Sequence, residues 1–257
     1  MKIEIPPSHP RYKSLLIREK LVEGFEKGLV VPQGLIAQGR GEAFDYLIGE
    51  KTESFAVKAI EAAAALLLLS EKPVISVNGN AAALVGEELV DFSNASRIPL
   101  EINLFYRTEE RVNKIRDYLL ELGAKYLYWQ ADGILPGLES NRRLVATRGI
   151  LGADTVLVML EDGDRTEALR RLGKNVIAVD LNPLSRTSLA ANITIVDNVV
   201  RAVPLLKQKY FELSERPREV SKQIIIEYDN RRIISESLDY MSKRLRELAG
   251  NLLTQNT

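Results

Sequence analysis

An acidic residue, a proline turn and a group of polar donors follow one apolar run of the chain. Asp180 ends the run 176–179, and Asn182-Pro183 and Arg186-Thr187-Ser188 follow it. A carboxylate at the end of a strand can accept hydrogen bonds from ribose hydroxyls, and the turn and donors can contact base and phosphate. The segment therefore predicts a nucleotide site. A strand that ends in aspartate before a polar loop, without a ligand, is the alternative.

A second segment, 76–84, passes from an apolar run through a glycine turn into an alanine-rich stretch. Asn78, Gly79 and Asn80 would lie where a strand gives way to a helix, and the backbone N–H groups of a helix start can bind an anion. The segment has neither the P-loop pattern nor the dinucleotide-binding glycine pattern. Arg107 follows the next strand and is expected at the same sheet edge. An asparagine-capped turn without a ligand is the alternative.

Three acids, Glu161, Asp162 and Asp164, follow another apolar strand and open a helix. Such oxygen ligands could hold Mg²⁺ directly or through water, but they also suit a helix start whose dipole favours negative charge, so metal ligands are not assigned. Because the carboxyl ends of parallel strands meet at one edge, we expect a single crevice there. Five strand ends should border it: Asn78, Arg107, Glu161, Asp180 and Asp197.

Two arginines precede the expected sheet. Arg40 lies between Gly39 and Gly41, within residues 34–41 that we expect to form a loop. Flanking glycines would let such a loop close over a phosphate, which the guanidinium could grip through two bonds. Arg18 lies in an expected helix, where a solvated surface position is the simpler interpretation.

The composition limits the possible chemistry. The 257 residues include no cysteine, one histidine, and equal numbers of basic and acidic residues, 35 of each. A thiolate nucleophile and a cysteine metal site are excluded, and a catalytic triad would have to use His9 in its proline-rich segment. Balanced charge argues against nucleic acid or a membrane surface as partner. No apolar run approaches the roughly 20 residues of a membrane span and no signal peptide is visible, so we expect a soluble cytoplasmic protein.

Apolar strands alternate with amphipathic helices from residue 73 onward. Several strands lack polar alternation, which is typical of a parallel sheet covered on both faces. Strands are expected at 74–77, 100–105, 125–129, 155–160, 176–181 and 193–196, and helices at 81–90, 109–122, 166–172 and 199–211. We therefore predict one α/β domain with a Rossmann-like, doubly wound parallel sheet and helical additions at both ends. Its parts are a helical N-terminal part (1–70), the core (73–212) and a C-terminal helical region (217–250).

The helical additions at the two ends of the chain contain two candidates for a dimer contact. Helices are expected at 12–27 and 55–69. The second is apolar on most sides, so the sheet and another layer should bury it, and a second subunit is one candidate for that layer. A further helix is expected at 229–248, before a frayed tail at 251–257. It carries a short coiled-coil-like seam, Ile234, Leu238, Met241, Leu245 and Leu248. Both helices are candidates for a dimer contact, and packing of the seam on the chain's own sheet is the alternative.

Five segments distributed over the chain carry a family resemblance: 9–12 (HPRY), 16–21 (LIREKL), 39–47 (GRGEAFDYL), 76–80 (SVNGN) and 180–187 (DLNPLSRT). Their order and spacing resemble archaeal phosphopantothenate synthetases, the 4-phosphopantoate–beta-alanine ligases of coenzyme A biosynthesis. The resemblance implies a homodimeric Rossmann-like enzyme that uses ATP and Mg²⁺ and forms AMP and pyrophosphate through an acyl-adenylate. It also implies ATP contacts from Arg18, Arg40, Asp180, Leu181, Asn182, Arg186, Thr187, Asn198 and Val199.

This chemistry suits a chain with little histidine and no cysteine, because arginines and Mg²⁺ neutralise charge without a titrating base. We expect Arg40 to act in catalysis and either Asp162 or Asp164 to accept the proton of the beta-alanine amine. The substrate's phosphate is expected at Asn78, Gly79 and Asn80, aided by Arg107. Two alternatives remain: a nicotinamide-dependent oxidoreductase, weakened by the missing glycine pattern, and a nucleotide-sensing module whose dimer state reports ATP.

Overall fold

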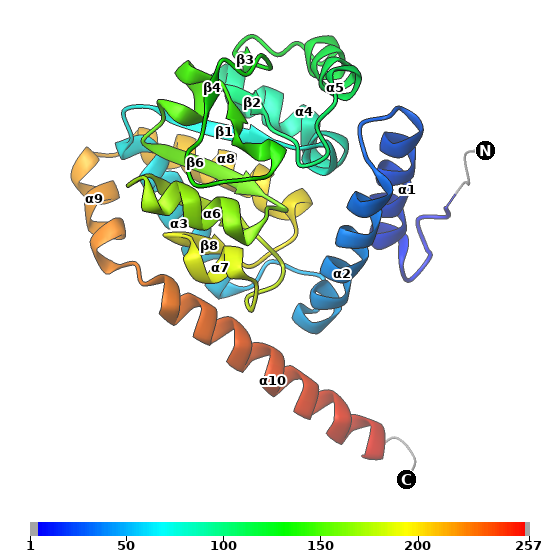
Figure 1. Ribbon diagram of the computed structural model, residues 1–257. Coiled ribbons are helices and arrows are strands. Elements are labelled where there is room, and N and C mark those ends of the chain that lie inside the picture. The colour runs from blue at the N-terminus through cyan, green and yellow to red at the C-terminus, as the bar shows by residue number, and fades with distance from the viewer. Residues whose placement is uncertain (1–4, 255–257) are drawn as a thin grey trace.

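The computed structural model describes residues 5–254, and its centre is a six-stranded sheet with helices on both faces (Figure 1). All neighbouring strands are parallel. The strands are β1 (Pro73–Val77), β2 (Leu100–Ile102), β3 (Leu127–Tyr128), β6 (Thr155–Met159), β7 (Asn175–Val179) and β8 (Ile193–Ile195). The predicted Rossmann-like, doubly wound sheet is confirmed, and every strand except β1 is shorter than expected.

Every strand of this sheet except the edge strand β3 buries both of its faces, which explains the largely apolar sequence of these strands. Ile75 and Val77 of β1 belong to the larger core, whereas Val74 belongs to the smaller core on the opposite face. The larger core is formed mainly by α3 (Ser54–Leu69), α4 (Gly79–Ser96), α5 (Glu109–Glu121) and α8 (Val199–Ser214). The smaller core is closed by α6 (Gly163–Arg171), α7 (Arg186–Ala190) and the segment between β3 and β6.

The strand order β3-β2-β1-β6-β7-β8 reverses direction between β1 and β6. From β1 the chain proceeds outward to β2 and β3, then returns to the middle and proceeds the other way. The loops that leave β1 and β6 therefore diverge at their carboxyl ends. In open α/β sheets ligands bind in the crevice at such a reversal.

The expected loop at 34–41 is wrong, because these residues lie inside helix α2 (Pro32–Ile48). Pro32 suits the first helical position, and Gly49, with a φ of 98°, ends the helix in the left-handed conformation. A glycine inside this helix has a packing reason: a Cβ on Gly34 would lie 2.2 Å from Oδ1 of Asn80. Helix α1 (Tyr12–Glu26) lies beside α2 at one flank of the sheet (Figure 1).

A small insertion between β3 and β6 was not expected from the sequence. It contains β4 (Gly133–Ile134), β5 (Leu144–Val145) and the short helices η1 (Asn141–Arg143) and η2 (Thr147–Leu151). Glu101 of β2 holds it: its carboxylate accepts hydrogen bonds from the backbone N–H groups of Ala146 (2.9 Å) and Ile150 (2.6 Å). Burial raises the pKa of Glu101 to about 7, although these two bonds act in the opposite direction.

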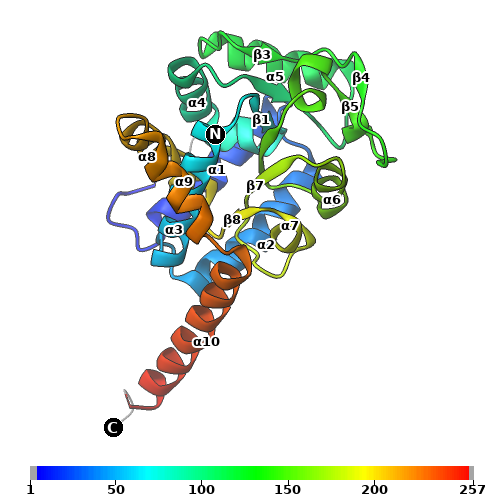
Figure 2. The same cartoon turned by 90° about the vertical axis from the view of Figure 1, so that its left-hand side faces the viewer.

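Helices α9 (Arg218–Glu227) and α10 (Asn230–Thr254) complete the chain, and α10 extends away from the body in both views (Figures 1 and 2). The frayed tail expected from residue 251 is helical to Thr254, and residues 255–257 lie outside the described part. Helix α3 packs on α8, α9 and α10 of the same chain, so no second subunit is needed to cover it. The seam of α10 is divided: Ile234 and Met241 are buried, while Leu245 and Leu248 are exposed.

Within residues 5–254, no helix combines the length and apolar character needed to cross a membrane.

Candidate active site

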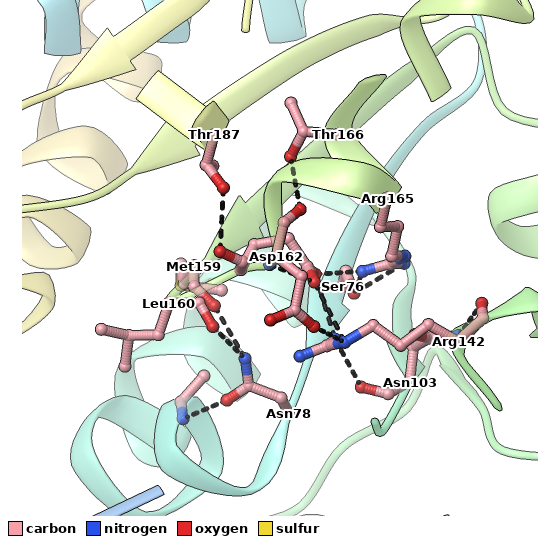
Figure 3. A network of polar contacts seen from close by, with 12 residues as sticks. Ser76, Asn78, Asn103, Arg142, Met159, Leu160, Asp162, Arg165, Thr166 and Thr187 are labelled. Atoms are coloured by element: carbon pink, nitrogen blue, oxygen red, sulfur yellow. Dashed lines mark hydrogen bonds and ion pairs between the residues drawn. The ribbon is translucent and has the colours of Figure 1, made fainter. Parts of the chain in front are cut away.

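Asn78 joins the two strands between which the sheet order reverses. Its Nδ2 donates to the carbonyl oxygens of Met159 (2.7 Å) and Leu160 (3.3 Å), and its Oδ1 accepts from the backbone N–H of Ala81, which caps α4 (Figure 3). Leu160 has a φ of 51°, a left-handed conformation that costs a β-carbon-bearing residue free energy. The bonds from Asn78 hold this turn, so the carboxyl ends of β1 and β6 form one rigid edge.

A cavity of about 250 Å³ opens at this edge. Segments from five parts of the chain meet there, as expected where the strand order of a Rossmann-like sheet reverses. Its lining consists of Val31, Gln33, Gly34, Ala37, Arg40, Asn78, Gly79, Asn80, Leu104, Phe105, Tyr106, Arg111, Arg142, Leu160 and Asp162. Five of the residues predicted from the sequence are brought together here: Arg40, Asn78, Gly79, Asn80 and Asp162.

Gly79 opens α4, and only glycine fits its position. A Cβ there would lie 2.0 Å from the carbonyl oxygen of Leu29 and 2.4 Å from Nη2 of Arg111. The first N–H groups of a helix have no partner within the helix, and the helix dipole makes that end favourable for an anion. Arg111 therefore places a guanidinium directly beside the start of a helix.

The guanidinium of Arg111 is held entirely by backbone carbonyls. Its Nε and Nη2 donate to Leu29 (3.0 and 2.8 Å), and its Nη1 donates to Tyr106 (2.9 Å). Burial, with the nearby charge of Arg142, lowers its pKa to about 10. No carboxylate within residues 5–254 forms an ion pair with it. This part of the cavity is therefore a fixed positive charge without a counterion from the described chain.

Arg142 reaches the same edge from the insertion and binds two carboxylates. Its Nε lies 3.1 Å from Glu161 and 2.9 Å from Asp162 (Figure 3). Glu161 is buried and also pairs with the fully buried Arg165, which donates to Ser76 Oγ at 3.1 Å. Both carboxylate oxygens of Glu161 are thus used by arginines. These two ion pairs fix the loop that follows β6.

The two other acids of this loop differ in position. Asp162 lines the cavity with a side chain that is 42% exposed, and burial raises its pKa, helped by Glu161 and Asp164 and opposed by Arg142. Asp164 lies in the first turn of α6, outside the cavity lining. Among residues 5–254 no group of three or more histidine, cysteine or acidic side chains is arranged to hold a metal ion.

The loop after β7 surrounds Asp180 with donors. Its Oδ1 accepts from the backbone N–H of Asn182 (2.9 Å) and its Oδ2 accepts from Ser185 Oγ (2.5 Å). Burial raises the pKa of Asp180, although these bonds and the charge of Arg40 lower it. The Asp180 carboxylate is therefore fixed at the edge, within the electrostatic reach of Arg40.

The neighbours of Asp180 link this loop to the rest of the edge. Thr187 Oγ1 donates to the carbonyl oxygen of Glu161 at 2.9 Å, which ties the loops after β6 and β7 together (Figure 3). Leu181 is buried near Gly41, where a Cβ would meet it at 3.5 Å. Arg186 is exposed and forms a two-bond contact with Glu167 of α6 (3.1 and 2.9 Å).

Asn198 and Val199 lie farther along the same edge, at the start of α8. Both are buried, and the side chain of Asn198 caps the helix through the N–H of Val200 while it donates to Asp45 of α2 at 2.9 Å. The start of α8 is thereby attached to the helix that carries Arg40.

Two predicted residues lie outside the cavity. Arg18 is exposed on α1 and pairs with Glu42 of α2 at 2.8 Å. Arg107 donates to the carbonyl oxygens of Ile102 (3.4 Å) and Trp129 (3.0 Å) and is absent from the cavity lining. Both arginines therefore have protein partners outside the cavity lining.

Sequence reasoning missed Arg111, Arg142 and the aromatic pair Phe105 and Tyr106. The rings of the pair lie 5.0 Å apart at 60° and border the cavity. Arg111 sits on an ordinary charged helix and Arg142 in an irregular insertion, so neither has a local signature. The available signal was a pair of adjacent aromatic residues shortly after the end of β2.

Comparison of the sequence with known proteins finds matches over most of the chain. Residues 55–244 match the model of the phosphopantothenate/pantothenate synthetase family. A 4-phosphopantoate–beta-alanine ligase of Thermococcus kodakarensis is 53% identical over 249 residues, which are 96% of this chain and 95% of the relative. The enzymes of the same name from Thermococcus onnurineus and Methanosarcina mazei are 52% and 47% identical, over 96% of this chain and 95% and 98% of their own lengths.

Proposed function

The chain belongs to the phosphopantothenate/pantothenate synthetase family, and on that basis we propose that it is a 4-phosphopantoate–beta-alanine ligase. It would use ATP and Mg²⁺ to join the carboxylate of 4-phosphopantoate to the amine of beta-alanine, with AMP and pyrophosphate as further products. The names of the relatives favour this ligase activity over an oxidoreductase or a nucleotide sensor.

One observation carries the proposal: arginines outnumber acidic side chains in the cavity where the strand order reverses, and only Arg142 among them is paired with carboxylates of residues 5–254. Arg40, Arg111 and Arg142 line it, and Asp162 is the only acidic side chain in its lining. A phosphorylated acid and a nucleoside triphosphate together bring many negative charges into one site. The guanidinium groups of Arg111 and Arg142 are held in a partly buried crevice, where Coulomb interactions with such charges are stronger than in water.

We propose that the phosphate of 4-phosphopantoate binds at the start of α4. The backbone N–H groups of Gly79 and Asn80 would face it, and Arg111 takes the place that we had expected Arg107 to fill. The dimethyl-substituted carbon of the substrate would lie against Phe105, Tyr106 and Leu160, which supply apolar surface on the same cavity.

ATP would bind along the loops that follow β7 and β8. Asp180 would accept hydrogen bonds from the ribose, and the other contacts would come from the remaining residues that the family resemblance indicates: Arg18, Leu181, Asn182, Arg186, Thr187, Asn198 and Val199. Arg40 stands between this region and the cavity, so it would contact the phosphates nearest the reaction centre. Arg18 would have to leave Glu42, or serve a site on a neighbouring copy.

In the first step the substrate carboxylate attacks the α-phosphorus of ATP, and pyrophosphate leaves with the bonding electrons. The side chains only align the reactants and neutralise charge, which a cationic cavity can do without a titrating group. Mg²⁺, when bound with ATP, would supply further neutralisation of the phosphate charge.

In the second step the amine of beta-alanine attacks the carbonyl carbon of the adenylate, and AMP leaves. One proton must be removed from the amine, and Asp162 is placed better than Asp164 to accept it, because only Asp162 lines the cavity. The raised pKa of Asp162 makes its carboxylate a stronger base, which favours transfer of the amine proton to it. Arg142 keeps its pairing with Glu161 while Asp162 takes the proton.

The same resemblance implies a homodimer, and the exposed half of α10 offers a surface for it. Leu245, Leu248, Leu252 and Leu253 are exposed on the part of the helix that extends from the body (Figures 1 and 2). Such a row of apolar side chains on a projecting helix is a common dimer element.

The proposal is tested by substrate omission. Purified protein, ATP, Mg²⁺, 4-phosphopantoate and beta-alanine should yield AMP and 4-phosphopantothenate in equal amounts. Omitting beta-alanine or 4-phosphopantoate should stop product formation. Absence of AMP from the complete mixture, or equal AMP formation without the phosphorylated acid, would overturn the proposal.

A further inference from the structure

Helix α2 is attached to the sheet edge at two points on either side of Arg40. Near its start, Asn80 of α4 donates to the carbonyl oxygen of Gly34 at 2.8 Å. Near its end, Asp45 contacts the start of α8. With a rise of 1.5 Å per residue, the two points lie about 16 Å apart along the helix, and Arg40 lies between them. The helix therefore spans from the start of α4 to the start of α8.

The second attachment is a buried ion network. Arg201 of α8 donates to Asp45 Oδ1 (2.6 Å) and to Asp197 Oδ1 (2.5 Å), while Asn198 Nδ2 donates to Asp45 Oδ2 (2.9 Å). Thr52 Oγ1 adds a bond to Asp197 Oδ2 at 2.6 Å. The side chains of Asp45 and Asp197 are 6% and 0% exposed. Losing one partner from such a network leaves another charge buried without compensation.

Arg40 itself has no such attachment. Its side chain is exposed, and within residues 5–254 it forms no hydrogen bond or ion pair with protein. Its place over the crevice is therefore set by the backbone of α2 and not by its own contacts. A shift of about 1 Å in a group that acts on the reaction centre can cost about a hundredfold in rate.

We propose that Asp45 and Arg201 are positioning residues: their ion pair fixes α2 against the start of α8 and so sets where Arg40 stands between the two substrates. This inference rests on the proposed function, since it takes Arg40 as the group that acts on phosphate. It also assigns a role in the reaction to two residues that do not line the cavity.

A double-mutant cycle on turnover tests the proposal. Asp45→Asn removes the charge but keeps the size, and we expect it to lower kcat about tenfold in folded protein. Combined with Arg40→Ala, it should add little, within about twofold of Arg40→Ala alone, because residues that act through one group are not additive. Wild-type kcat in Asp45→Asn, or reductions that multiply in the double variant, would overturn it.

Two further variants separate positioning from stability. Lys174→Met removes a buried charge at the opposite sheet edge, where Nζ donates to the carbonyl oxygens of Leu151 (2.7 Å) and Ala153 (2.6 Å). It should lower Tm and leave kcat unchanged. Arg201→Lys retains a charge but loses the two-carboxylate fork, and it should lower kcat in the same direction as Asp45→Asn. If Asp45→Asn does not fold, the cycle is run with Arg201→Lys.

The proposed function is checked separately from this inference. Failure of the wild-type protein to form AMP overturns the ligase assignment. The cycle is then measured on ATP affinity by calorimetry, with the same expected non-additivity between Asp45→Asn and Arg40→Ala. A large stability loss in Asp45→Asn with unchanged kcat and unchanged ATP affinity would mean that the network only holds the fold.

Discussion

The side-chain amide of Asn78 donates to the carbonyl oxygen of Met159 at 2.7 Å, and this bond joins the ends of the two strands at which the sheet reverses its order. The other end of the same amide caps α4. One side chain thus fixes the strand end, the helix start and the turn at Leu160. The cavity that we propose as the active site lies against this junction.

Asp180→Ala should weaken ATP binding far more than it weakens folding, because it removes a proposed ribose acceptor at the edge of the sheet. A loss of about 1.5–3 kcal/mol raises Kd roughly tenfold to a hundredfold. Calorimetry measures it. Asp154→Ala is a matched control, since Asp154 accepts backbone bonds from Glu71 and Lys72 at the opposite edge. Equal ATP affinity in wild type and Asp180→Ala would remove Asp180 from the site.

Arg40→Ala should lower kcat by about a hundredfold or more, the usual cost of losing one donor to a charged transition state. Arg40→Lys should be less severe, since it keeps the charge and loses only the planar fork. Steady-state kinetics on both variants measures the difference. If both variants ligate at the wild-type rate, Arg40 is a surface residue of α2. Asp45 would then have no catalytic group to position.

Asp162→Asn should reduce the second half-reaction about 10²-fold to 10⁴-fold, the range of general base catalysis. The base acts in its ionised form, and burial raises the pKa of Asp162, so wild-type turnover should fall with decreasing pH at values above the ordinary aspartate range. Asp162→Asn should lack this acid limb, and Asp164→Asn should retain it. An acid limb that persists in Asp162→Asn would transfer the role to another group.

Glu101 should make stability depend on pH. Its pKa in the folded protein is about 7, above the ordinary 4.5, so its contribution is complete below pH 4.5 and is lost as pH rises through 7. The difference corresponds to about 3 kcal/mol. Urea unfolding at several pH values should show this decline in wild type relative to Glu101→Gln. Parallel curves for the two proteins would mean that the bonds from Ala146 and Ile150 keep the pKa low.

Leu245→Glu combined with Leu248→Glu should yield a folded monomer, because both side chains are exposed in the single chain and are the proposed dimer contact. The earlier seam positions Ile234 and Met241 are unsuitable for this test, since the chain itself buries them. Light scattering gives the mass, and circular dichroism checks the fold. A double variant that stays dimeric would show that the end of α10 does not form the dimer contact.

The sheet could be predicted from the sequence because each strand is an apolar run between turns, and burial on both faces demands such runs. Residues 34–41 could not be predicted in the same way. Their glycines suggest a loop by local propensity, but the contact of Gly34 with Asn80 and the proline start keep them helical. Tertiary packing overrides propensity here.

The candidate site was predictable only where its residues follow strands. Asn78, Asp162 and Asp180 could be located because strand ends of a parallel sheet share one edge. Arg111 and Arg142 enter the cavity from a helix face and an insertion, and only the folded chain brings them to Gly79 and Glu161. The strands β4 and β5 have two residues each, too few for any periodicity to be read.

The central claim is that the carboxylate of 4-phosphopantoate attacks the α-phosphorus of ATP in the cavity beside Asn78. Substrate labelled with heavy oxygen in its carboxylate tests this directly. After complete reaction with beta-alanine, mass spectrometry should find one label atom in the phosphate of AMP and none in pyrophosphate. Label in inorganic phosphate, with ADP as the nucleotide product, would indicate an acyl phosphate and contradict the account.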